Sequence, residues 1–401
     1  MVNFVWDWLA HPDIDELIVR IAEAEPHEDW TKTVQRLRKQ LTADEARQVL
    51  EQAELRRRAR SKFPMAHRLW LTRRGLEQST SATIATYKAE TLGPAQYLAD
   101  LCCGIGGDAM ALGQIGHVLA VDRDTEMATI VNHNLSVTNV NSYAVRCDVM
   151  DQIDLSACDA VHVDPDRRSS GRTISPDRFD PPLADILARL GRHRAGIKVA
   201  PASHIDADVA SDCHREWIGH DRECKQQMLW MNVPDRPSGL RSATVIDSTG
   251  SAHRLTPHGR NDAQPLVSLA SRLGEFVIEP HNAVTASGLS ELLANQISAE
   301  RLDLRGNLLT ADSAMLSPFY AVFHVLEMVP LRFDRIVASI EHYRLGPIEW
   351  KKNGLDVGWW SAAIKKHFDG QRPGSVICTR YRDRHVAIIG FRSNSVATTT
   401  T

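Results

Sequence analysis

The sequence contains no run of about 18 apolar residues, the length that a helix needs to cross a membrane. It has no Cys-x-x-Cys pair and no His-x-x-Glu-His motif, and its 7 cysteines are an odd number, so we expect neither a metal site nor disulfide bonds. The first residues, MVNFVWDWLAHPDIDE, carry acidic side chains where a signal peptide carries positive charge. These absences predict a cytoplasmic protein with reduced thiols, no membrane segment and no metal ion.

What the sequence does contain is an ordinary globular composition with an uneven distribution of charge. The 401 residues are 43% hydrophobic and 24% charged, which is enough for two or three domains with proper cores. The net charge is −3, yet residues 331–401 carry a net charge of +6, and a second basic run lies between Glu54 and Arg74. Two basic regions in an acidic chain indicate either a polyanion-binding face or solvated surfaces, and charge alone leaves both open.

Secondary-structure signals divide the chain into parts. Helical apolar spacing dominates the first 75 residues, where Thr42-Ala-Asp-Glu45 has the form of a capping box. Short apolar strands then alternate with helical segments, which is the pattern of a parallel α/β sheet. The later strands, 227–231 and 242–246, are expected to form an antiparallel edge pair, and residues 319–329 to form a helix. We therefore expect a helical N-terminal domain (1–75), a doubly wound seven-stranded Rossmann-like α/β sheet (76–265), a partly helical connecting segment (266–330), a small α+β domain (331–395) and a disordered tail (396–401).

The most informative stretch is Leu98-Ala-Asp-Leu-Cys-Cys-Gly-Ile-Gly-Gly-Asp108, in which a strand runs into a glycine loop and then into a helix. Glycines let the backbone approach a ligand closely, and the start of the helix offers free N–H groups. Asp122 ends the next strand, where a carboxylate can accept both hydroxyls of a ribose. The spacing Gly104-x-Gly106-x-x-Ala109 also fits a dinucleotide site, although Asp100 before the glycines would repel a pyrophosphate.

The same stretch resembles the first two motifs of class I methyltransferases, which bind the cationic cofactor S-adenosylmethionine. That resemblance places Asp148, after the third strand, where the family has its adenine-contacting acid; a helix N-cap is the other reading of this residue. At the end of the fourth strand, Asp164-Pro165 resembles the Asp-Pro-Pro signature of methyltransferases that modify exocyclic amines of bases. The chain departs from that signature at Asp166, Arg167 and Arg168, where the family has a second proline and an aromatic residue.

Over residues 60–395 the chain is similar to a bacterial branch of the RNA cap guanine (trimethylguanosine synthase) methyltransferase superfamily that carries a C-terminal THUMP-like domain, a type of RNA-binding module. The motifs that carry this resemblance are the helix led by Thr80, the Cys-Gly-x-Gly-Gly loop, Asp164-Pro-x-Arg-Arg168 and the segment that begins at Gly346. It implies a class I methyltransferase domain in residues 76–265, a THUMP-like domain in residues 331–395 and an RNA partner. It also implies roles: the cofactor would be held by Thr80, Asp100, Cys102, Gly104, Gly106, Gly107, Asp122 and Asp148; the acceptor would face Asp164 and Pro165; and the nucleic acid would be gripped by Arg167, Arg168, Lys351, Lys352, Arg380, Arg382 and Arg384.

Several alternatives stay open at this stage. Lys198, at the end of the fifth strand, can reach either a phosphate or a neighbouring carboxylate, and His162 is expected to be a hydrogen-bonded packing residue. The acceptor can be RNA, a small molecule or a protein, and a catalytically degenerate RNA-binding protein fits the departures around Asp166. A nicotinamide oxidoreductase is the remaining class. The sequence leaves the oligomeric state open.

Overall fold

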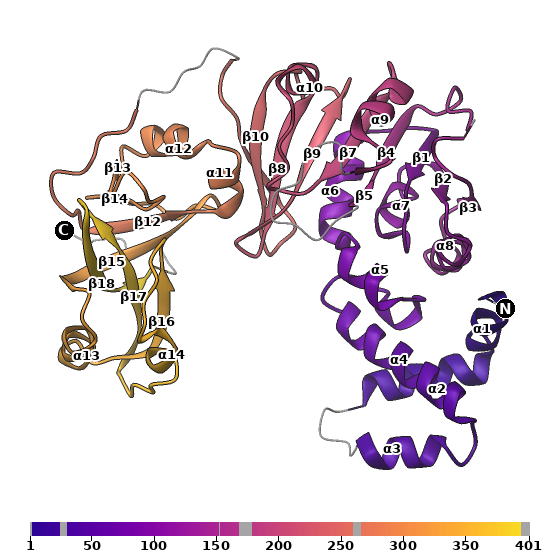
Figure 1. Ribbon diagram of the computed structural model, residues 1–401, viewed down its shortest axis with the longest axis horizontal. Coiled ribbons are helices and arrows are strands. Elements are labelled where there is room, and N and C mark those ends of the chain that lie inside the picture. Colours follow the sequence, from indigo (N-terminus) through magenta and orange to yellow (C-terminus); the bar gives the residue numbers. More distant parts are fainter. Residues whose placement is uncertain (1, 25–29, 152, 168–178, 260–265, 394–401) are drawn as a thin grey trace. The chain divides into compact units, whose positions relative to one another are not determined.

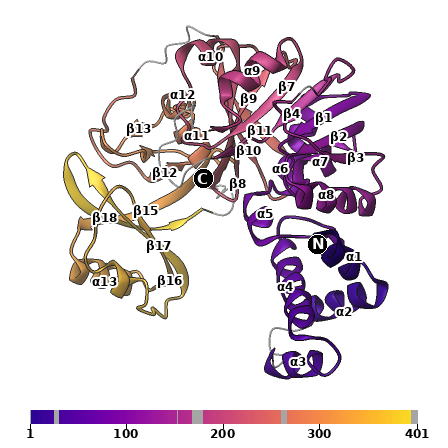
Figure 2. The same ribbon diagram turned by 45° about the vertical axis from the view of Figure 1, so that its right-hand side comes forward.

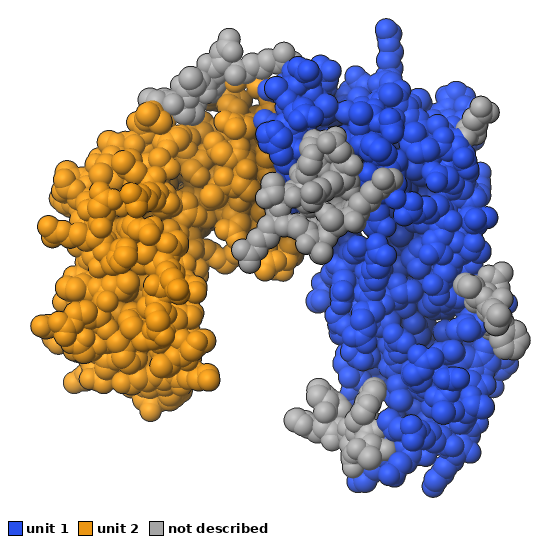
Figure 3. Space-filling model, in the orientation of Figure 1, with its two compact units in different colours: residues 1–215, 227–239 blue, residues 216–226, 240–401 orange. Residues whose placement is uncertain are grey.

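The computed structural model describes residues 2–24, 30–151, 153–167, 179–259 and 266–393 (Figure 1). The chain forms two compact units, residues 1–215 with 227–239 and residues 216–226 with 240–401 (Figure 3). No helix in the described segments is long and apolar enough to span a membrane. The tail 396–401, expected to be disordered, lies outside the described residues.

The N-terminal part is helical, as the spacing of its apolar residues predicts. The expected capping box is confirmed: the Thr42 hydroxyl accepts a hydrogen bond from the Glu45 backbone, and the Glu45 carboxylate accepts one from the Thr42 backbone. The helices of this part are α1 (Val2–Leu9), α2 (Pro12–Glu23), α3 (Trp30–Leu37), α4 (Ala43–Ala59), the short 3₁₀ helix η1 (Ala66–Arg68), α5 (Arg73–Gln78) and α6 (Ala82–Leu92).

Several basic residues between Glu54 and Arg74 make contacts that stabilise the fold. Arg56 is 1% exposed and its guanidinium lies 2.7 Å from the carboxylate of Asp15. Arg57 and Arg60 donate to carbonyl groups at the end of α2, which the helix itself leaves without partners. Lys62 donates to three backbone carbonyls at the end of α5 and after it, those of Leu76, Glu77 and Ser79. These four cations make contacts within the fold, but Arg68, Arg73 and Arg74 of the same run are exposed, so both interpretations of the run, a polyanion-binding face or a solvated surface, stay predictions.

The first sheet has the expected parallel core. Five parallel strands lie in the order β7-β4-β1-β2-β3, which Figure 2 shows side by side, and β9 pairs with β7 in the antiparallel direction. Further strands extend the described sheet to β11-β10-β8-β9-β7-β4-β1-β2-β3. Its strands are β1 (Tyr97–Leu101), β2 (His117–Asp122), β3 (Tyr143–Arg146), β4 (Ala160–Val163), β7 (Arg194–Val199), β8 (His214–His220), β9 (Glu223–Met231), β10 (Arg241–Ile246) and β11 (Ala252–Leu255). The segments between them contain α7 (Gly107–Leu112), α8 (Thr125–Val137), α9 (Leu183–Leu190), α10 (Ala207–Asp212) and the small ribbon of β5 (Asp166–Arg167) and β6 (Phe179–Asp180).

The expected antiparallel edge pair of residues 227–231 and 242–246 is wrong. Both segments are strands, β9 and β10, but β8 lies between them. The sequence of β8, HREWIGH, contains three charged or titratable side chains in its first three positions and gives no clear apolar pattern. Two of these, His214 and Glu216, are nevertheless buried, and Glu216 accepts a hydrogen bond from Thr244 of β10.

The second sheet is mostly antiparallel, with the order β13-β14-β12-β15-β18-β17-β16 in the described residues. Residues 319–329, expected to be helical, form most of the long strand β15 instead. An apolar run is compatible with both helical and strand periodicity, and here pairing with β12 and β18 makes the segment a strand. Strands from the expected connecting segment therefore share one sheet with strands from 331–395. The elements are β12 (Phe276–Pro280), α11 (Asn282–Ala286), α12 (Ser290–Gln296), β13 (Glu300–Arg301), β14 (Leu309–Ala311), β15 (Tyr320–Pro330), α13 (Phe333–His342), β16 (Leu345–Lys352), α14 (Trp360–Ala363), β17 (Arg372–Tyr381) and β18 (Arg384–Arg392).

Candidate cofactor and acceptor site

The glycine loop lies between the end of β1 and the start of α7. Cys102, Gly104 and Gly106 all have positive φ, at 60°, 55° and 84°. A Cβ added to Gly107 would stand 3.0 Å from the carbonyl oxygen of Thr80, so the two backbones touch there. At Gly104 an added Cβ would meet no atom of the described residues within 4 Å, which leaves open space beside the loop. The loop is therefore tightly packed at one end and accessible at the other.

Asp122 is held against this loop. Its Oδ2 atom accepts a hydrogen bond of 2.9 Å from the backbone N–H of Gly104, and its Oδ1 atom accepts one of 3.0 Å from Asp124. Burial raises the pKa of Asp122, and the two backbone N–H groups oppose that rise. The parallel pairing of β1 with β2 brings this carboxylate, 18 residues further along the chain, to the glycines.

Two faces of the sheet have opposite chemistry at β1, β4 and β7. Leu101, Val163 and Val199 point into an apolar core that also includes α9. Side chains alternate along a strand, so the neighbouring even-numbered positions face the other way. Asp100 and His162 occupy this second face, where Lys88 of α6 reaches them. Asp100, His162 and Lys88 therefore form a polar layer on one face of the sheet, beneath the glycine loop, while the opposite face is apolar at these strands.

Asp100 is 1% exposed and accepts a hydrogen bond of 2.7 Å on Oδ1 from Nδ1 of His162. Its other oxygen, Oδ2, is buried and has no hydrogen-bond partner among the described residues. Burial raises the pKa of this carboxyl group, and the hydrogen bond from His162 opposes the rise. A buried acceptor without a donor fits a ligand that brings positive charge, as the amino-acid part of S-adenosylmethionine does.

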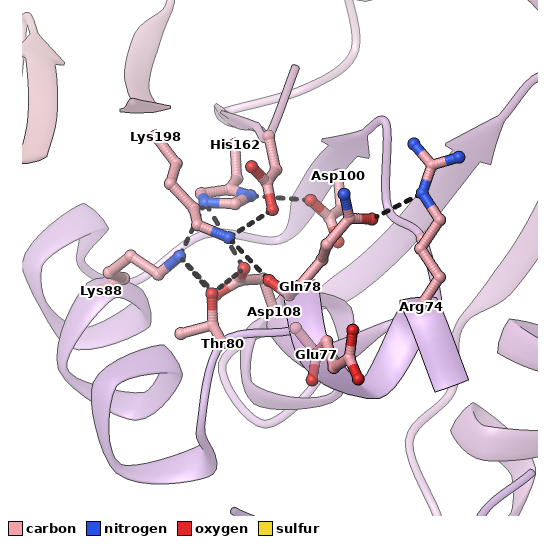
Figure 4. Close-up of polar contacts among 12 residues, drawn as sticks. Arg74, Glu77, Gln78, Thr80, Lys88, Asp100, Asp108, His162 and Lys198 are labelled. Carbon is pink, nitrogen blue, oxygen red and sulfur yellow. Dashed lines mark hydrogen bonds and ion pairs between the residues drawn. The ribbon is translucent and has the colours of Figure 1, made fainter. Parts of the chain in front are cut away.

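The polar layer continues through side chains that sequence reasoning missed (Figure 4). The ammonium of Lys88 lies 3.1 Å from Nε2 of His162 and 2.5 Å from Oδ1 of Asp108. Thr80 donates a hydrogen bond of 2.9 Å to Oδ2 of Asp108. Burial lowers the pKa of Lys88; burial alone would raise that of Asp108, but the ammonium of Lys88 holds it well below its usual range. The feature of the sequence that could have revealed this network is a lysine on the apolar side of helix 82–92.

The acceptor side of the site follows β4. Asp164 comes directly after this strand, with its side chain 30% exposed, and its Oδ2 atom lies 2.6 Å from the ammonium of Lys198 at the end of β7. Lys198 also donates to the backbone carbonyl of Gln78. The sequence left Lys198 able to contact either a phosphate or a neighbouring carboxylate, and the described structure shows the contact with a carboxylate. Pro165 is buried beside Asp164.

The remaining predicted residues of this region fall in different places. Asp166 pairs with Arg74 at 3.1 Å, and Arg167 belongs to the β5–β6 ribbon. Arg168 lies outside the described residues. Asp148 is exposed and accepts a hydrogen bond from the backbone of Met150, so it caps a turn in the absence of a ligand.

The basic residues predicted to contact RNA lie on β16, β17, β18 and the turn between the last two. Lys351 is neutralised by Glu279, at 2.9 Å, and its side chain is 19% exposed. Lys352 is exposed and stands over the ring of Trp360. The other three are Arg380, which is half-buried, Arg382, which donates to a backbone carbonyl, and the exposed Arg384. Within the described residues, no group of three or more His, Cys, Asp or Glu side chains is arranged to hold a metal ion.

Comparison with known proteins gives one extensive structural likeness. Residues 5–59 match the model of a domain of unknown function, DUF8688. No curated protein matches the chain. The crystal structure of a candidate methyltransferase from Porphyromonas gingivalis W83 is similar over 96% of this chain and 99% of that chain, at 19% identity and a TM-score of 0.73. A T. thermophilus 16S rRNA methyltransferase in complex with AdoMet and guanosine is similar over 37% of this chain and 42% of that chain, at 18% identity and a TM-score of 0.31.

The likeness to the Porphyromonas protein shows that the two chains share a fold over nearly their whole lengths. This fold combines N-terminal helices, a mostly parallel sheet that matches a methyltransferase core, and a second, mostly antiparallel sheet.

Proposed function

We propose that this protein is an S-adenosylmethionine-dependent methyltransferase. The observation that carries the proposal is the hydrogen bond from the Gly104 backbone to Asp122, which sets a ribose-binding carboxylate beside an open glycine loop. Asp100, before the loop, adds a buried carboxylate oxygen without a donor. When bound, the cofactor supplies a methyl group on a positively charged sulfur.

In this proposal, different residues around the loop contact different parts of the cofactor. Asp122 accepts hydrogen bonds from the ribose hydroxyls, and Asp100 faces the ammonium group of the amino-acid part. Asp148, whose carboxylate already binds a backbone N–H, lies where it can accept from the adenine amine. The carboxylate of Asp100 also argues against a dinucleotide cofactor, because it would repel a pyrophosphate at the same loop. The remaining cofactor contacts come from Thr80, Cys102, Gly104, Gly106 and Gly107.

We further propose that the acceptor is a nucleotide base of RNA. Asp164 and the carbonyl of Pro165 can hold an exocyclic NH2 group in line with the methyl carbon, because methyl transfer needs an aligned nucleophile more than a strong base. The partly exposed side chain of Asp164 supports this role. Arg167, Arg168 and the exposed cations of the second sheet would contact the nucleic acid; among these, Lys352 and Arg384 are the most available and Lys351 the least. The THUMP-like character of residues 331–395 belongs to this proposal.

Transfer of a tritiated methyl group from S-adenosylmethionine to total bacterial RNA tests the proposal. Wild-type protein should label RNA, and Asp164→Ala should abolish labelling while it still binds S-adenosylhomocysteine. The matched control is Asp154→Ala, which removes an exposed turn carboxylate that accepts a hydrogen bond from the backbone N–H of Ser156. Full activity of Asp164→Ala would remove Asp164 from the acceptor site.

The rival acceptors are a small molecule or a protein, and a degenerate site would bind RNA without modifying it. Contacts with phosphates release counterions, so RNA binding should weaken steeply as salt rises. A Michaelis constant that does not depend on salt would favour a small-molecule acceptor instead. Salt-sensitive RNA binding without any methyl transfer would favour the degenerate alternative.

A further inference from the structure

The buried network beneath the glycine loop has an unbalanced charge. It contains two carboxylates, Asp100 and Asp108, but one ammonium, that of Lys88, together with the imidazole of His162. All four side chains are nearly inaccessible: the exposed fraction is 1% for Lys88 and Asp100, 0% for His162 and 8% for Asp108. With both carboxylates ionised and the imidazole neutral, the network carries a net charge of −1. An isolated buried charge is costly, so such a network gains by taking up either a proton or a cation.

The hydrogen bonds that run from Lys88 through His162 end at Asp100, which accepts the last one. The ammonium of Lys88 has only protons to offer, so Nε2 of His162 accepts from it and Nδ1 of His162 carries the proton donated to Asp100. Asp108 fixes Lys88 from the other side, and Thr80 fixes Asp108. Each polar side chain of the network is therefore oriented by a neighbouring one. The exception is the Oδ2 atom of Asp100, which has no hydrogen-bond partner among the described residues.

Other charged groups facing Asp100 do not supply the missing cation. Lys198 of β7 acts electrostatically on Lys88 of the network, but its ammonium lies 2.6 Å from the carboxylate of Asp164, which follows β4. Asp122, at the end of β2, adds another negative charge. The thiols that follow Asp100, those of Cys102 and Cys103, are kept neutral because burial raises their pKa. The open end of the network is therefore surrounded by negative or neutral groups.

We propose that Lys88, Asp108 and His162 are positioning residues that hold the Asp100 carboxylate as the acceptor for the cofactor's ammonium group, whose binding expels one proton from the Asp100 carboxyl group. This inference rests on the proposed function, since it assumes a cofactor with an amino-acid part. The proton leaves to solvent, and the incoming ammonium takes over its charge and its hydrogen bond. The net charge of the network with its bound cation is then zero.

Proton release predicts a specific dependence of affinity on pH. Below the midpoint at which the Asp100 carboxyl group loses its proton, affinity for S-adenosylhomocysteine should rise about tenfold for each pH unit. Above it affinity should be constant until the ligand's own ammonium group loses its proton. Removing the positive charge in Lys88→Met makes the network bind its proton more tightly, which moves the midpoint to higher pH. Removing a negative charge in Asp108→Asn moves it to lower pH. Simple damage to packing would impair both variants in the same direction.

Calorimetric titration with S-adenosylhomocysteine, repeated in buffers with different ionisation heats and across the pH range, measures affinity and counts the released protons together. The control ligand is 5′-methylthioadenosine, which lacks the amino-acid part and should release no proton. The double variant Lys88→Met/Asp108→Asn restores the wild-type net charge and should return the midpoint close to the wild-type value. Thermal unfolding of each variant checks that it is folded, and the double variant keeps the test decisive where a single variant is unstable.

Opposite shifts in the two single variants, with recovery in the double variant, support the inference. Shifts in the same direction, no shift, or no proton release by the wild-type protein would overturn it while leaving the methyltransferase proposal intact. Equal proton release with 5′-methylthioadenosine would also overturn it, because the ammonium would then not be the cause. If the wild-type protein does not bind S-adenosylhomocysteine at any pH, the proposed function itself fails.

Discussion

The backbone N–H of Gly104 donates a hydrogen bond of 2.9 Å to Oδ2 of Asp122. This contact joins the end of one parallel strand to the loop that follows its neighbour, so the two sequence motifs form a single site. It also holds the carboxylate of Asp122 at the backbone of Gly104, where an added Cβ would meet no atom of the described residues within 4 Å. The open space and the oriented carboxylate together define where we propose that the ribose of the cofactor binds.

Gly104→Ala should fold but bind cofactor poorly. The substitution places a methyl group in the open space beside the loop, and positive φ adds a conformational cost of about 1 kcal/mol. We expect at least about a tenfold loss of affinity for S-adenosylhomocysteine, because the methyl group takes volume that the ligand needs. Calorimetric titration and urea denaturation of the same preparation measure the two effects separately.

The matched control for this substitution is Gly250→Ala in a turn of the second unit. Gly250 also has positive φ, and an added Cβ there would likewise meet no atom within 4 Å. It should lose a similar amount of stability without any loss of cofactor affinity. Unchanged affinity in Gly104→Ala would show that the ligand does not approach the loop at this position.

Lys198→Met tests whether this lysine positions Asp164 or grips a phosphate. Because its ammonium lies 2.6 Å from Oδ2 of Asp164, we expect kcat for methyl transfer to fall about 10- to 100-fold with little change in the KM for RNA. The control is Lys225→Met, which removes a lysine paired with the exposed Glu223. A raised KM with an unchanged kcat would assign Lys198 to the RNA backbone instead.

Asn134 connects the N-terminal helices to the glycine loop. Its side-chain oxygen accepts from the backbone N–H of Trp70, and its side-chain nitrogen donates to the carbonyls of Trp70 and Ile105. The residue is fully buried, so Asn134→Ala should lower the free energy of unfolding by about 3 kcal/mol, as measured by urea denaturation. The exposed Asn141→Ala is the control and should change stability by less than about 0.5 kcal/mol. Equal stability of the two variants would contradict this account.

His281 should make stability depend on pH. Burial, with smaller contributions from Arg222 and His220, lowers the pKa of His281 to about 4, and its Nδ1 atom accepts a hydrogen bond from the backbone of Ala283. The unfolded chain therefore binds a proton between its ordinary pKa of 6.5 and about 4 that the folded chain does not bind. Stability should fall as pH falls through this window, by about 2 kcal/mol for this residue.

His281→Asn isolates that contribution. Asparagine can accept the same hydrogen bond at the start of α11 but does not titrate in this window. The variant should lose less stability than the wild-type protein between about pH 7 and about pH 4.5, as measured by thermal unfolding. Parallel pH dependence in the two proteins would show that His281 does not titrate as described.

The parallel sheet and the glycine loop were predictable because their signals are local. A strand, a glycine loop and a helix start follow one another within residues 97–112. The strand expected before the glycine loop and the one expected before Asp164 are both confirmed, as β1 and β4. The acids at strand ends were also predictable, since parallel strands bring their carboxyl ends to one edge of the sheet. The roles of these residues with a cofactor and an acceptor stay predictions.

The features that the sequence did not reveal depend on pairing between distant segments. Lys88 lies among apolar residues of α6, and its partners Asp108 and His162 come from α7 and β4. The strand β15 was mistaken for a helix because its apolar run has no alternation that excludes one. The basic run around Arg56 suggested a charged surface, but the guanidinium of Arg56 is buried against Asp15, and Arg57 donates to a backbone carbonyl of α2.

The most direct test of the central claim is calorimetric titration of the purified protein with S-adenosylhomocysteine, beside NADH. We predict micromolar binding of S-adenosylhomocysteine, loss of that binding in Asp122→Ala, and retention in Asp124→Ala, whose exposed carboxylate caps α8 instead of facing the loop. NADH should not bind. Absence of S-adenosylhomocysteine binding to the wild-type protein, or full binding by Asp122→Ala, would contradict the cofactor site described for the glycine loop.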